Sequence, residues 1–172
     1  MRSFAELAAE RYSLKKYSDR PLEEDKLMKI LEVGNLAPTA RNCQAHRIYV
    51  LRSPEAVAKA NELTACTYGA TTVLLFTYSL EEVYTYPGDE PFNSGAEDCA
   101  IVASHIMLEA ADLGVGSCWV NRFEPAKAKA LFAIPDSEVP VLVMPLGYPA
   151  EGAGPLPNHT KKKKLEETVR FL

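Results

Sequence analysis

The sequence lacks a long hydrophobic run. No apolar stretch reaches the roughly eighteen residues that a membrane-spanning helix needs. The N-terminal sequence MRSFAELAAERYS is amphipathic, carries two acidic residues and has no apolar core of the kind found in secretory signals. These absences argue against a membrane protein and against a secreted one, so we expect a cytoplasmic protein.

Cysteine and histidine are few and scattered, and no C-x-x-C pair occurs. The four cysteines are Cys43, Cys66, Cys99 and Cys118. The three histidines are His46, His105 and His159. A zinc site or a disulfide framework needs such residues at short, repeated spacings. We therefore expect reduced, mostly buried thiols and no metal site.

The chain also lacks an excess of positive charge and a glycine-rich phosphate loop. Its 19 basic and 23 acidic residues give a net charge of -4, which argues against general nucleic-acid binding. No G-x-x-x-x-G-K-[ST] motif occurs. The glycine-rich stretch GVGSCW, residues 114–119, follows a helical pattern and enters a strand pattern, the reverse of the order in a dinucleotide-binding motif. Any phosphate must therefore be held by side chains.

The patterns that are present predict one domain of 172 residues, without an internal repeat. Helical spacing, caps and breakers predict one helix that begins near residue 4 and further helices over residues 22–37, 54–63, 97–113 and 124–134. Apolar, β-branched runs predict strands at residues 46–52, 71–79, 115–120 and 139–148. The helix at 97–113 is apolar nearly all round, so we expect it to be deeply buried. This alternation favours an α/β or α+β class with helices on both faces of one sheet.

Three polar clusters are candidates for binding chemistry. RYSLKKY gathers Arg11, Ser13 and Lys15, PTARNCQ occupies residues 38–44, and KKKK occupies residues 161–164. Arginine and lysine are the side chains that best hold a phosphate monoester. Taken singly, the first cluster is also compatible with a solvated face and the second with a loop that caps a helix end. The third is also compatible with a solubilising tail or a docking patch for an acidic partner.

Together, these segments resemble the nitroreductase family of FMN-dependent NAD(P)H oxidoreductases. RYSLKKY resembles the family's R-x-S-x-[KR]-x-[FY] opening, and LAPTARNCQAHRIYVL resembles its A-P-S-x-x-N-x-Q-P-W segment and first strand. EDCAIVASHIMLEAADLGVGSCWV is similar to the family's central helix and the turn after it. PVLVMPLGYPAE, followed by lysines and LEE, is similar to the family's ending. The four matches occur in order from about residue 10 to about residue 170.

The resemblance implies a fold, an assembly and an activity. The fold is α+β, a nitroreductase-like three-layer sandwich with helices around one central mixed β-sheet, formed by a single FMN-binding domain over residues 1–172. The assembly is a homodimer in which residues 149–172 form a C-terminal extension that reaches the partner subunit. The activity is ping-pong hydride transfer from NADH or NADPH, through N5 of FMN, to an electron-poor acceptor such as a nitroaromatic or a quinone.

The resemblance also implies roles for particular residues. Arg11 and Ser13 would contact the FMN phosphate, and Lys15 would lie near the N1 and O2 edge of the flavin, where a cation favours the reduced anion. Lys161 and Lys163 would complete the phosphate site. The partner subunit would supply the loop residues Pro38, Thr39, Ala40 and Asn42. The turn residues Ser117, Cys118, Trp119 and Val120 would run along the flavin. No obligatory acid or base residue is implied.

The chain departs from the family at Gln44, Ala45 and His46, where Q-P-W is usual. His46 either titrates near neutrality and faces the site or is a hydrogen-bonded strand histidine. Trp119 is also compatible with a plain core position. Two other functions stay open: a flavin-binding or sensor protein without useful turnover, and a scaffold without flavin whose lysine tail docks an acidic partner.

Overall fold

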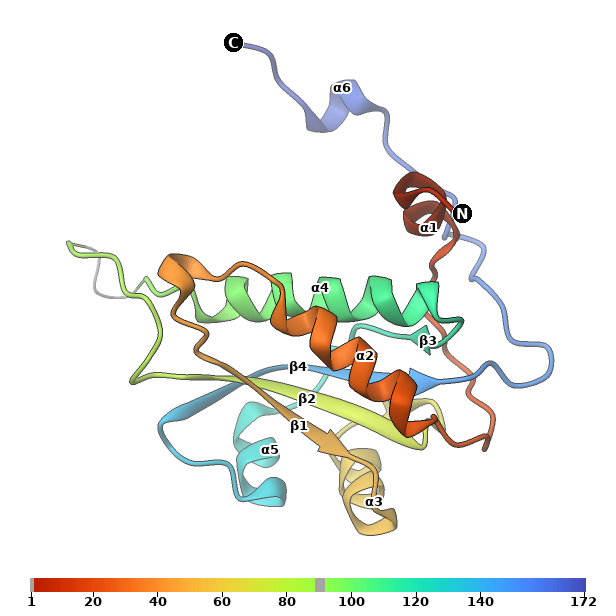
Figure 1. Cartoon of the computed structure of the whole chain (residues 1–172), viewed down its shortest axis with the longest axis horizontal. Coiled ribbons are helices and arrows are strands. Elements are labelled where there is room, and N and C mark those ends of the chain that lie inside the picture. The colour runs from red at the N-terminus through yellow and green to blue at the C-terminus, as the bar shows by residue number, and fades with distance from the viewer. Residues whose placement is uncertain (1, 89–91) are drawn as a thin grey trace.

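One four-stranded sheet runs through the middle of the molecule, with helices on both faces (Figure 1). The computed structural model describes residues 2–88 and 92–172. The sheet has the order β1-β2-β4-β3. Its strands are β1 (His46–Leu51), β2 (Thr72–Ser79), β4 (Glu138–Gly147) and β3 (Gly116–Ser117). The expected α+β, three-layer architecture is confirmed.

The sheet is not mixed in the way we expected. The ladders that join these four strands are all antiparallel, and a single bridge between Ser13 and Ser117 is parallel. The reason lies in the connection between β1 and β2. Leu51 at the end of β1 pairs with Val73 at the start of β2, so helix α3 (Pro54–Leu63) returns the chain at the same end of the sheet. Alternating helices and strands therefore produce a hairpin-like return here and not a parallel crossover.

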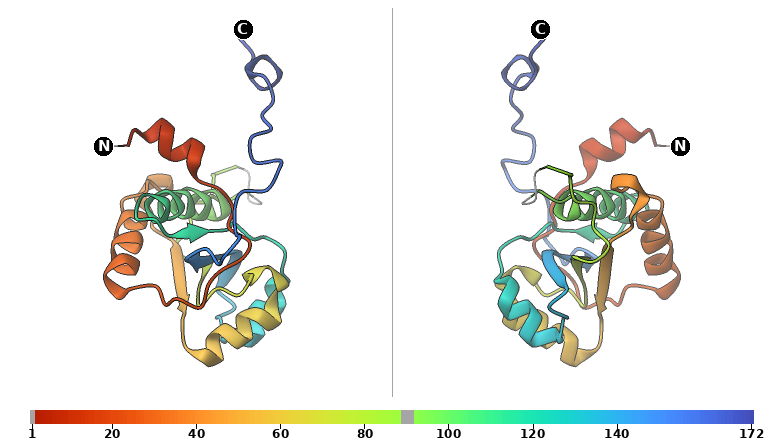
Figure 2. Two further views of the ribbon diagram at one scale, coloured as in Figure 1. Left: turned by 90° about the vertical axis from the view of Figure 1, so that its right-hand side faces the viewer. Right: turned by 90° about the vertical axis from the view of Figure 1, so that its left-hand side faces the viewer.

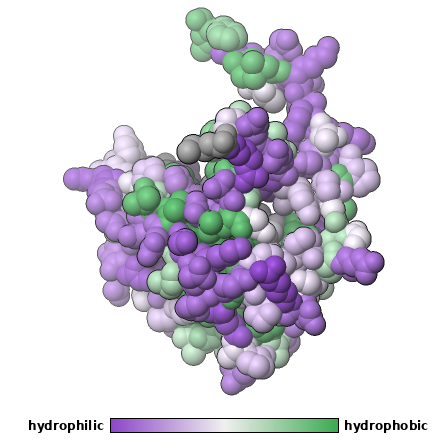
Figure 3. Space-filling model, turned by 45° about the vertical axis from the view of Figure 1, so that its right-hand side comes forward, coloured by the Kyte–Doolittle hydropathy of each residue, from purple (hydrophilic) through white to green (hydrophobic). Residues whose placement is uncertain are grey.

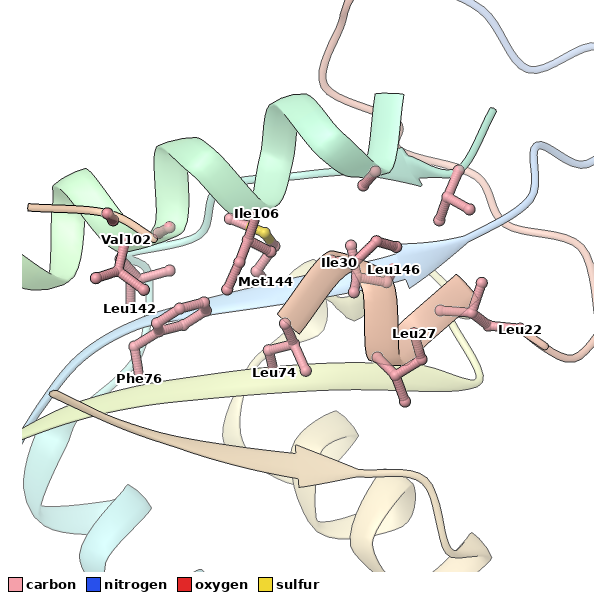
Figure 4. Close-up of a cluster of buried hydrophobic side chains, with 14 of the residues drawn as sticks. Leu22, Leu27, Ile30, Leu74, Phe76, Val102, Ile106, Leu142, Met144 and Leu146 are labelled. Carbon is pink, nitrogen blue, oxygen red and sulfur yellow. The ribbon is translucent and has the colours of Figure 1, made fainter. Parts of the chain in front are cut away.

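Strand β2 is buried along its whole length because each of its two faces packs into a hydrophobic core. Leu74 and Phe76 point into a core with helices α2 (Glu24–Asn35) and α4 (Gly95–Asp112), as Figure 4 shows. Val73 and Leu75 point to the opposite face, in a core that α3 and α5 (Pro125–Phe132) cover. The continuous apolar run of the sequence follows from this two-sided burial.

Several helix ends are where the sequence predicts them. The Ser53 side chain accepts a hydrogen bond from the Ala56 N–H, with Pro54 in the first turn of α3. Helix α1 (Phe4–Glu10) begins with a capping box between Ser3 and Glu6. Two short 3-10 helices, η1 (Ala40–Asn42) and η2 (Ala65–Thr67), precede β1 and β2.

Helix α4 is less buried than its composition predicts. Val102 and Ile106 are fully buried against the sheet and α2, but Ile101 on the outer side is 38% exposed and Leu108, two turns further on, is only partly buried. One chain therefore leaves part of the outer side of this helix uncovered. The expectation of a helix buried all round is wrong within a single subunit.

The C-terminal segment leaves the body of the molecule (Figures 1 and 2). It ends in α6 (Leu165–Thr168), and Leu165 and Phe171 are exposed by 68% and 95%. Figure 3 shows apolar residues gathered at the tip of this projection. Within residues 2–88 and 92–172, none of the helices combines the length and the apolar composition needed to cross a membrane.

A polar cluster at the start of α2 provides a pH-dependent contribution to stability. Hydrogen bonds from the Tyr148 hydroxyl and from Arg20 lower the pKa of Glu23 to about 2. Glu23 therefore stabilises the fold above the ordinary glutamate value of 4.5, and this contribution is lost as the pH falls from 4.5 towards 2. The carboxylate is well exposed, so solvent screening keeps the effect small.

Glu23→Gln is therefore expected to lower the free energy of unfolding in urea at about pH 6 and to have a smaller effect at about pH 3. Lys59, whose salt bridge with Glu55 is on the surface of α3, offers a control as Lys59→Gln. A gap between wild type and Glu23→Gln that is unchanged from about pH 6 to about pH 3 would contradict the assignment.

Candidate functional site

The segment that connects α1 to α2 lies along the edge strand β3. Ser13 forms the parallel bridge with Ser117, and the Leu14 N–H donates to the Ser117 carbonyl at 2.9 Å. Leu14 is 1% exposed and anchors the segment in the core. Because side chains alternate along an extended chain, Arg11, Ser13 and Lys15 lie on the side opposite Leu14. The RYSLKKY pattern therefore presents two cations and a hydroxyl together.

Gly116 is what lets this segment approach β3 so closely. A Cβ atom at Gly116 would lie 2.4 Å from Leu14 Cδ2 and 3.3 Å from the Gly147 carbonyl oxygen. Gly116 of the GVGSCW turn is thus required for close packing against the Leu14 side chain and the Gly147 carbonyl. The sequence pattern alone does not distinguish this use from wrapping a phosphate.

The predicted residues of the opening motif converge on Cys118. Burial raises the pKa of the Cys118 thiol, while Lys15, a hydrogen bond with Ser13 and Arg11 act to lower it. The geometry agrees: Ser13 bridges Ser117 beside the turn after β3, Arg11 lines one hollow with Ser117, and Lys15 lines another with Ser13. The structure thus brings together Arg11, Ser13, Lys15, Ser117 and Cys118.

Lys15 has further neighbours that the sequence analysis did not single out. Its Nζ lies 5.9 Å from the centre of the Tyr68 ring. A hydrogen bond with Tyr68 lowers the pKa of the partly buried Cys66 thiol, and Arg122 and Lys15 act in the same direction. The pKa of Tyr68 is raised to about 12 by its hydrogen bond with Cys66 and by burial. No spacing in the sequence links residues 66–68 to residue 15, because β2 and its neighbours bring them together.

Two hollows flank the Arg11–Lys15 segment. One of about 250 Å³ is lined by Arg11, Leu14, Gly116 and Ser117, among others. The buried Ser117 hydroxyl has no hydrogen-bond partner within the described part of the chain. The other hollow, about 210 Å³, is lined by Tyr12, Ser13, Lys15, Leu156, Asn158 and His159. Both hollows are smaller than the roughly 300–1,000 Å³ typical of ligand pockets, so neither alone would enclose a ligand of cofactor size.

The other turn residues are placed by the sheet. Val120 N–H and carbonyl both pair with Val143 at 2.9 Å, which continues the chain beside β4. Trp119 is partly buried against the core, and its indole N–H donates to the Asn121 side chain. Lys161 and Lys163 are exposed, two and four residues beyond His159, where the tail still touches the body.

The loop predicted to contact flavin lies far from this site in the same chain. The Ala40 N–H donates to Asp98 Oδ1 at 2.8 Å, at the first turn of α4. Ala111, which lines the hollow beside Arg11, is 13 residues further along that helix. At about 1.5 Å per residue, the two ends are about 20 Å apart. Figure 1 shows the loop and the start of the 11–15 segment at opposite ends of α4.

The loop itself has an unusual backbone. Arg41, Asn42 and Gln44 have φ values of 51°, 57° and 51°, in the left-handed region that few non-glycine residues adopt. The Thr39 hydroxyl accepts from the Gln44 N–H at 3.1 Å, and the Arg41 guanidinium lies 5.9 Å from the Tyr84 ring centre. The loop is therefore an ordered turn, a geometry that a polar sequence does not reveal.

The interpretation of His46 as a strand histidine with its ring nitrogens hydrogen-bonded is wrong. Its Nδ1 is buried with no hydrogen-bond partner among the described residues. Burial and Arg47 lower the pKa of His46, and Asp98 opposes them. Burial of the ring and the neighbouring Arg47 charge therefore both favour the neutral imidazole at this corner.

Asp98 holds the 38–42 loop against α4, and removing its carboxylate is expected to release that loop. Asp98 is 3% exposed, and it also accepts a hydrogen bond from the Ser94 hydroxyl at 2.7 Å. Asp98→Ala leaves the buried Ser94 hydroxyl and the partly buried Ala40 N–H without this acceptor and is expected to cost about 1–3 kcal/mol in urea unfolding. Asp98→Asn keeps the shape and one acceptor oxygen, so it should cost clearly less. Equal costs for the two variants would contradict this role.

Each of the four cysteines is free, with Cys99 and Cys118 buried and Cys43 and Cys66 partly buried. In the part of the chain that the structure describes, no three His, Cys, Asp or Glu side chains group in a way that could hold a metal ion.

These features define an α+β protein with cationic and hydroxyl donors gathered beside an edge strand. The Nitroreductase family model matches residues 8–68 and 63–148, and the chain belongs to the nitroreductase family. The chain is 32% identical over 155 residues to a Methanothermobacter thermautotrophicus protein named "Putative NADH dehydrogenase/NAD(P)H nitroreductase", with 84% of this chain and 76% of that protein covered. An Archaeoglobus fulgidus protein of the same name is 32% identical over 149 residues, with 82% of each covered.

A solved structure supports the same family. The crystal structure of a nitroreductase family protein from Clostridium difficile 630 superposes with a TM-score of 0.92 and 33% identity, over 99% of this chain and 98% of that one. The resemblance drawn from the sequence motifs is therefore confirmed, and so is the α+β three-layer fold that it implies, with an antiparallel sheet in place of the mixed one.

Proposed function

We propose that the chain is an FMN-dependent oxidoreductase that takes hydride from NADH or NADPH and delivers it to an electron-poor acceptor such as a nitroaromatic or a quinone. The observation that carries this proposal is the gathering of Arg11, Ser13 and Lys15 beside the strand edge at Ser117. The printed names of the archaeal relatives, which include NAD(P)H nitroreductase, support the donor class. The predicted cytoplasmic location stays a prediction.

The residues present fit FMN. A phosphate monoester needs charge-assisted donors, and Arg11 and Ser13 would supply them. Lys15 would stand beside the N1 and O2 edge, where a fixed cation stabilises negative charge. The Ser117 hydroxyl, which has no hydrogen-bond partner among residues 2–88 and 92–172, and the backbone of residues 117–120 would offer further polar groups to the ring system. When bound, FMN supplies the hydride-transfer chemistry itself, so the protein needs no catalytic acid or base.

A second copy of the chain would complete the site. The loop of Pro38, Thr39, Ala40 and Asn42 lies about 20 Å from Arg11 along α4, by the rise of the helix. In a homodimer, the partner's loop would take the place that this chain's own loop cannot reach. Apolar surface for the contact would come from the exposed Ile101 on α4 and from Leu165 and Phe171 in the projecting segment 149–172. Lys161 and Lys163 would then close the phosphate end.

NAD(P)H and the acceptor would occupy the same open face in turn, which gives a ping-pong order. A second candidate function stays open because Ala45 and His46 replace the usual proline and tryptophan. A flavin-binding or sensor protein without useful turnover would retain FMN but would not transfer hydride at a useful rate.

An absorbance spectrum tests the proposal. The purified chain, mixed with FMN and desalted, is expected to retain the flavin bands, and anaerobic NADH or NADPH should bleach them within seconds to minutes. Retained bands that do not bleach with either nucleotide would favour the sensor alternative. Loss of all flavin on desalting would overturn the proposal, and binding to an acidic partner through residues 161–164 would then be measured against salt.

A further inference from the structure

A hollow of about 440 Å³ lies where the end of α3 meets the start of α5, on one face of the sheet (Figure 1). It is lined by Leu63, Asn121, Arg122, Phe123, Glu124 and Lys127. The volume is within the roughly 300–1,000 Å³ of typical ligand pockets, and Leu63 and Phe123 give it an apolar wall. The residues proposed above for FMN do not line it, so it is available to another ligand.

The backbone of Arg122 is fixed on both sides of this hollow. Its carbonyl oxygen accepts a hydrogen bond from the Thr64 hydroxyl at 2.7 Å. Just before it, the Asn121 side chain donates to the Val141 carbonyl at 2.9 Å and accepts from the Trp119 indole. A side chain on a fixed backbone starts from a defined position, which lowers the entropic cost of holding a ligand.

The Arg122 guanidinium is exposed, and in the part of the chain that the structure describes it makes no salt bridge or side-chain hydrogen bond. The second cation of the hollow, Lys127, is already engaged. Its Nζ donates to the Glu62 carbonyl oxygen at 2.7 Å and lies 3.5 Å from the Glu62 carboxylate. Glu124 lines the hollow but forms no salt bridge with Arg122. Among the described lining residues, Arg122 is therefore the cation left to bind an anion.

A short turn connects Arg122 to the part of the site where flavin is proposed. The Thr64 hydroxyl that binds the Arg122 carbonyl also accepts from the Cys66 N–H at 3.2 Å. Two residues further on, the Tyr68 ring centre lies 5.9 Å from Lys15 Nζ. The pKa of the Cys66 thiol agrees, since its hydrogen bond with Tyr68 lowers it and both cations act in the same direction. A ligand held at Arg122 can therefore extend toward the ring system that Lys15 would contact.

We propose that Arg122 binds the carboxylate of an aromatic acceptor, which makes aromatic acids a preferred acceptor class of this chain. This inference rests on the proposed function and names the kind of acceptor. A guanidinium pairs with a carboxylate through two parallel hydrogen bonds. Leu63 and Phe123 offer apolar surface to the aromatic ring. Glu124 opposes the binding of an anion, because its negative charge lines the same hollow.

Binding of benzoate compared with benzamide tests the proposal, because the two have the same ring and nearly the same shape but only benzoate is charged. Each is titrated into the full-length, oxidised, FMN-loaded protein, and the change in the flavin absorption bands gives the dissociation constant. Arg122→Gln is expected to raise the constant for benzoate about tenfold or more, as for lost hydrogen bonds to a charged group. The constant for benzamide should change less than about twofold. Arg122→Lys should lie between, because lysine keeps the charge without the paired donors.

Two further variants separate a local charge from the net charge. Glu124→Gln is expected to tighten benzoate binding about two- to fivefold, the size of an exposed charge interaction. Lys59→Gln removes one positive charge from the surface of α3, outside the hollow, and should leave both constants unchanged. Equal weakening of benzoate and benzamide by Arg122→Gln would overturn the proposal, because it would show a structural role for the turn. Unchanged benzoate binding would overturn it as well.

The phosphate of the donor is the other anion that Arg122 could contact, so NADP⁺ and NAD⁺ are titrated in the same way. A loss in Arg122→Gln that is confined to NADP⁺ would overturn the assignment to the acceptor. A wild-type protein that retains FMN and is bleached by NADH or NADPH, but binds benzoate no better than benzamide, would overturn this inference alone. A wild-type protein that retains no FMN would overturn the proposed function and this inference with it.

Discussion

A chain that ends at Gly154 is expected to lose both FMN and the dimer. The truncation removes the tail residues that reach the Ser13 and Lys15 side of the site, at Asn158 and His159. It also removes the projecting end, whose Leu165 and Phe171 are exposed by 68% and 95% in one subunit. Side chains of this kind gain free energy only when another surface covers them. Size-exclusion chromatography with light scattering, and absorbance after desalting, measure the two losses.

A second truncation separates the two functions of the tail. A chain that ends at Lys164 keeps Asn158 and His159 but lacks α6 and the apolar end. It is expected to dissociate more readily than the full chain, and to hold FMN better than the chain that ends at Gly154 whenever it is dimeric. Full retention of yellow dimers after truncation at Gly154 would show that the tail contributes to neither the flavin site nor the assembly.

Much of the fold follows from local rules that the chain obeys. Residues 72–79 form an apolar strand because both faces of β2 are covered. Residues 54–63 form a helix that begins where Ser53 and Pro54 place it. Each signal lies within a few residues of the structure that it specifies, so the sequence alone is sufficient to predict it.

The remaining features depend on contacts between distant segments. The antiparallel direction of β1 and β2 depends on which way α3 turns the chain, and no residue in 54–63 encodes that direction. The exposed side of α4 depends on what else packs there. Apolar composition predicts burial but does not say whether the cover is the same chain or a second copy.

The candidate site shows the same division. Arg11, Ser13 and Lys15 were predictable because alternation in an extended segment puts them on one side. Their neighbours Tyr68 and Cys66 were not, since β2 and the turn at residues 65–68 bring them in from a distant part of the sequence. The return of the tail at His159 was also hidden, because the Pro/Gly-rich stretch before it gives no structural signal.

Gly116→Ala is expected to destabilise the fold and weaken FMN binding together. The added methyl would lie 2.4 Å from Leu14 Cδ2 and 3.2 Å from Leu14 Cβ, and Leu14 is 1% exposed, so the side chain has no free space to move into. The Gly147 carbonyl oxygen at 3.3 Å blocks the other direction. Relief therefore requires the 11–15 segment to shift away from β3. Overpacking of this kind costs about 1–3 kcal/mol.

The same shift would misplace Arg11, Ser13 and Lys15, which explains why stability and cofactor affinity should fall together. Gly154→Ala is the control, because a Cβ there meets nothing within 4 Å and its backbone is not left-handed. Urea unfolding and FMN titration are measured on both variants. Only the variant at Gly116 should change.

A double-mutant cycle with Leu14→Ala identifies the cause. Leu14→Ala alone removes a buried side chain and is expected to cost about 2–5 kcal/mol. Because it also empties the space that the new methyl needs, the double variant should be less destabilised than the sum of the two single variants. Additive costs would mean that Leu14 and Gly116 do not constrain each other. In that case the close approach of the RYSLKKY segment to β3 would not depend on the glycine, and another contact must hold the phosphate-binding residues in place.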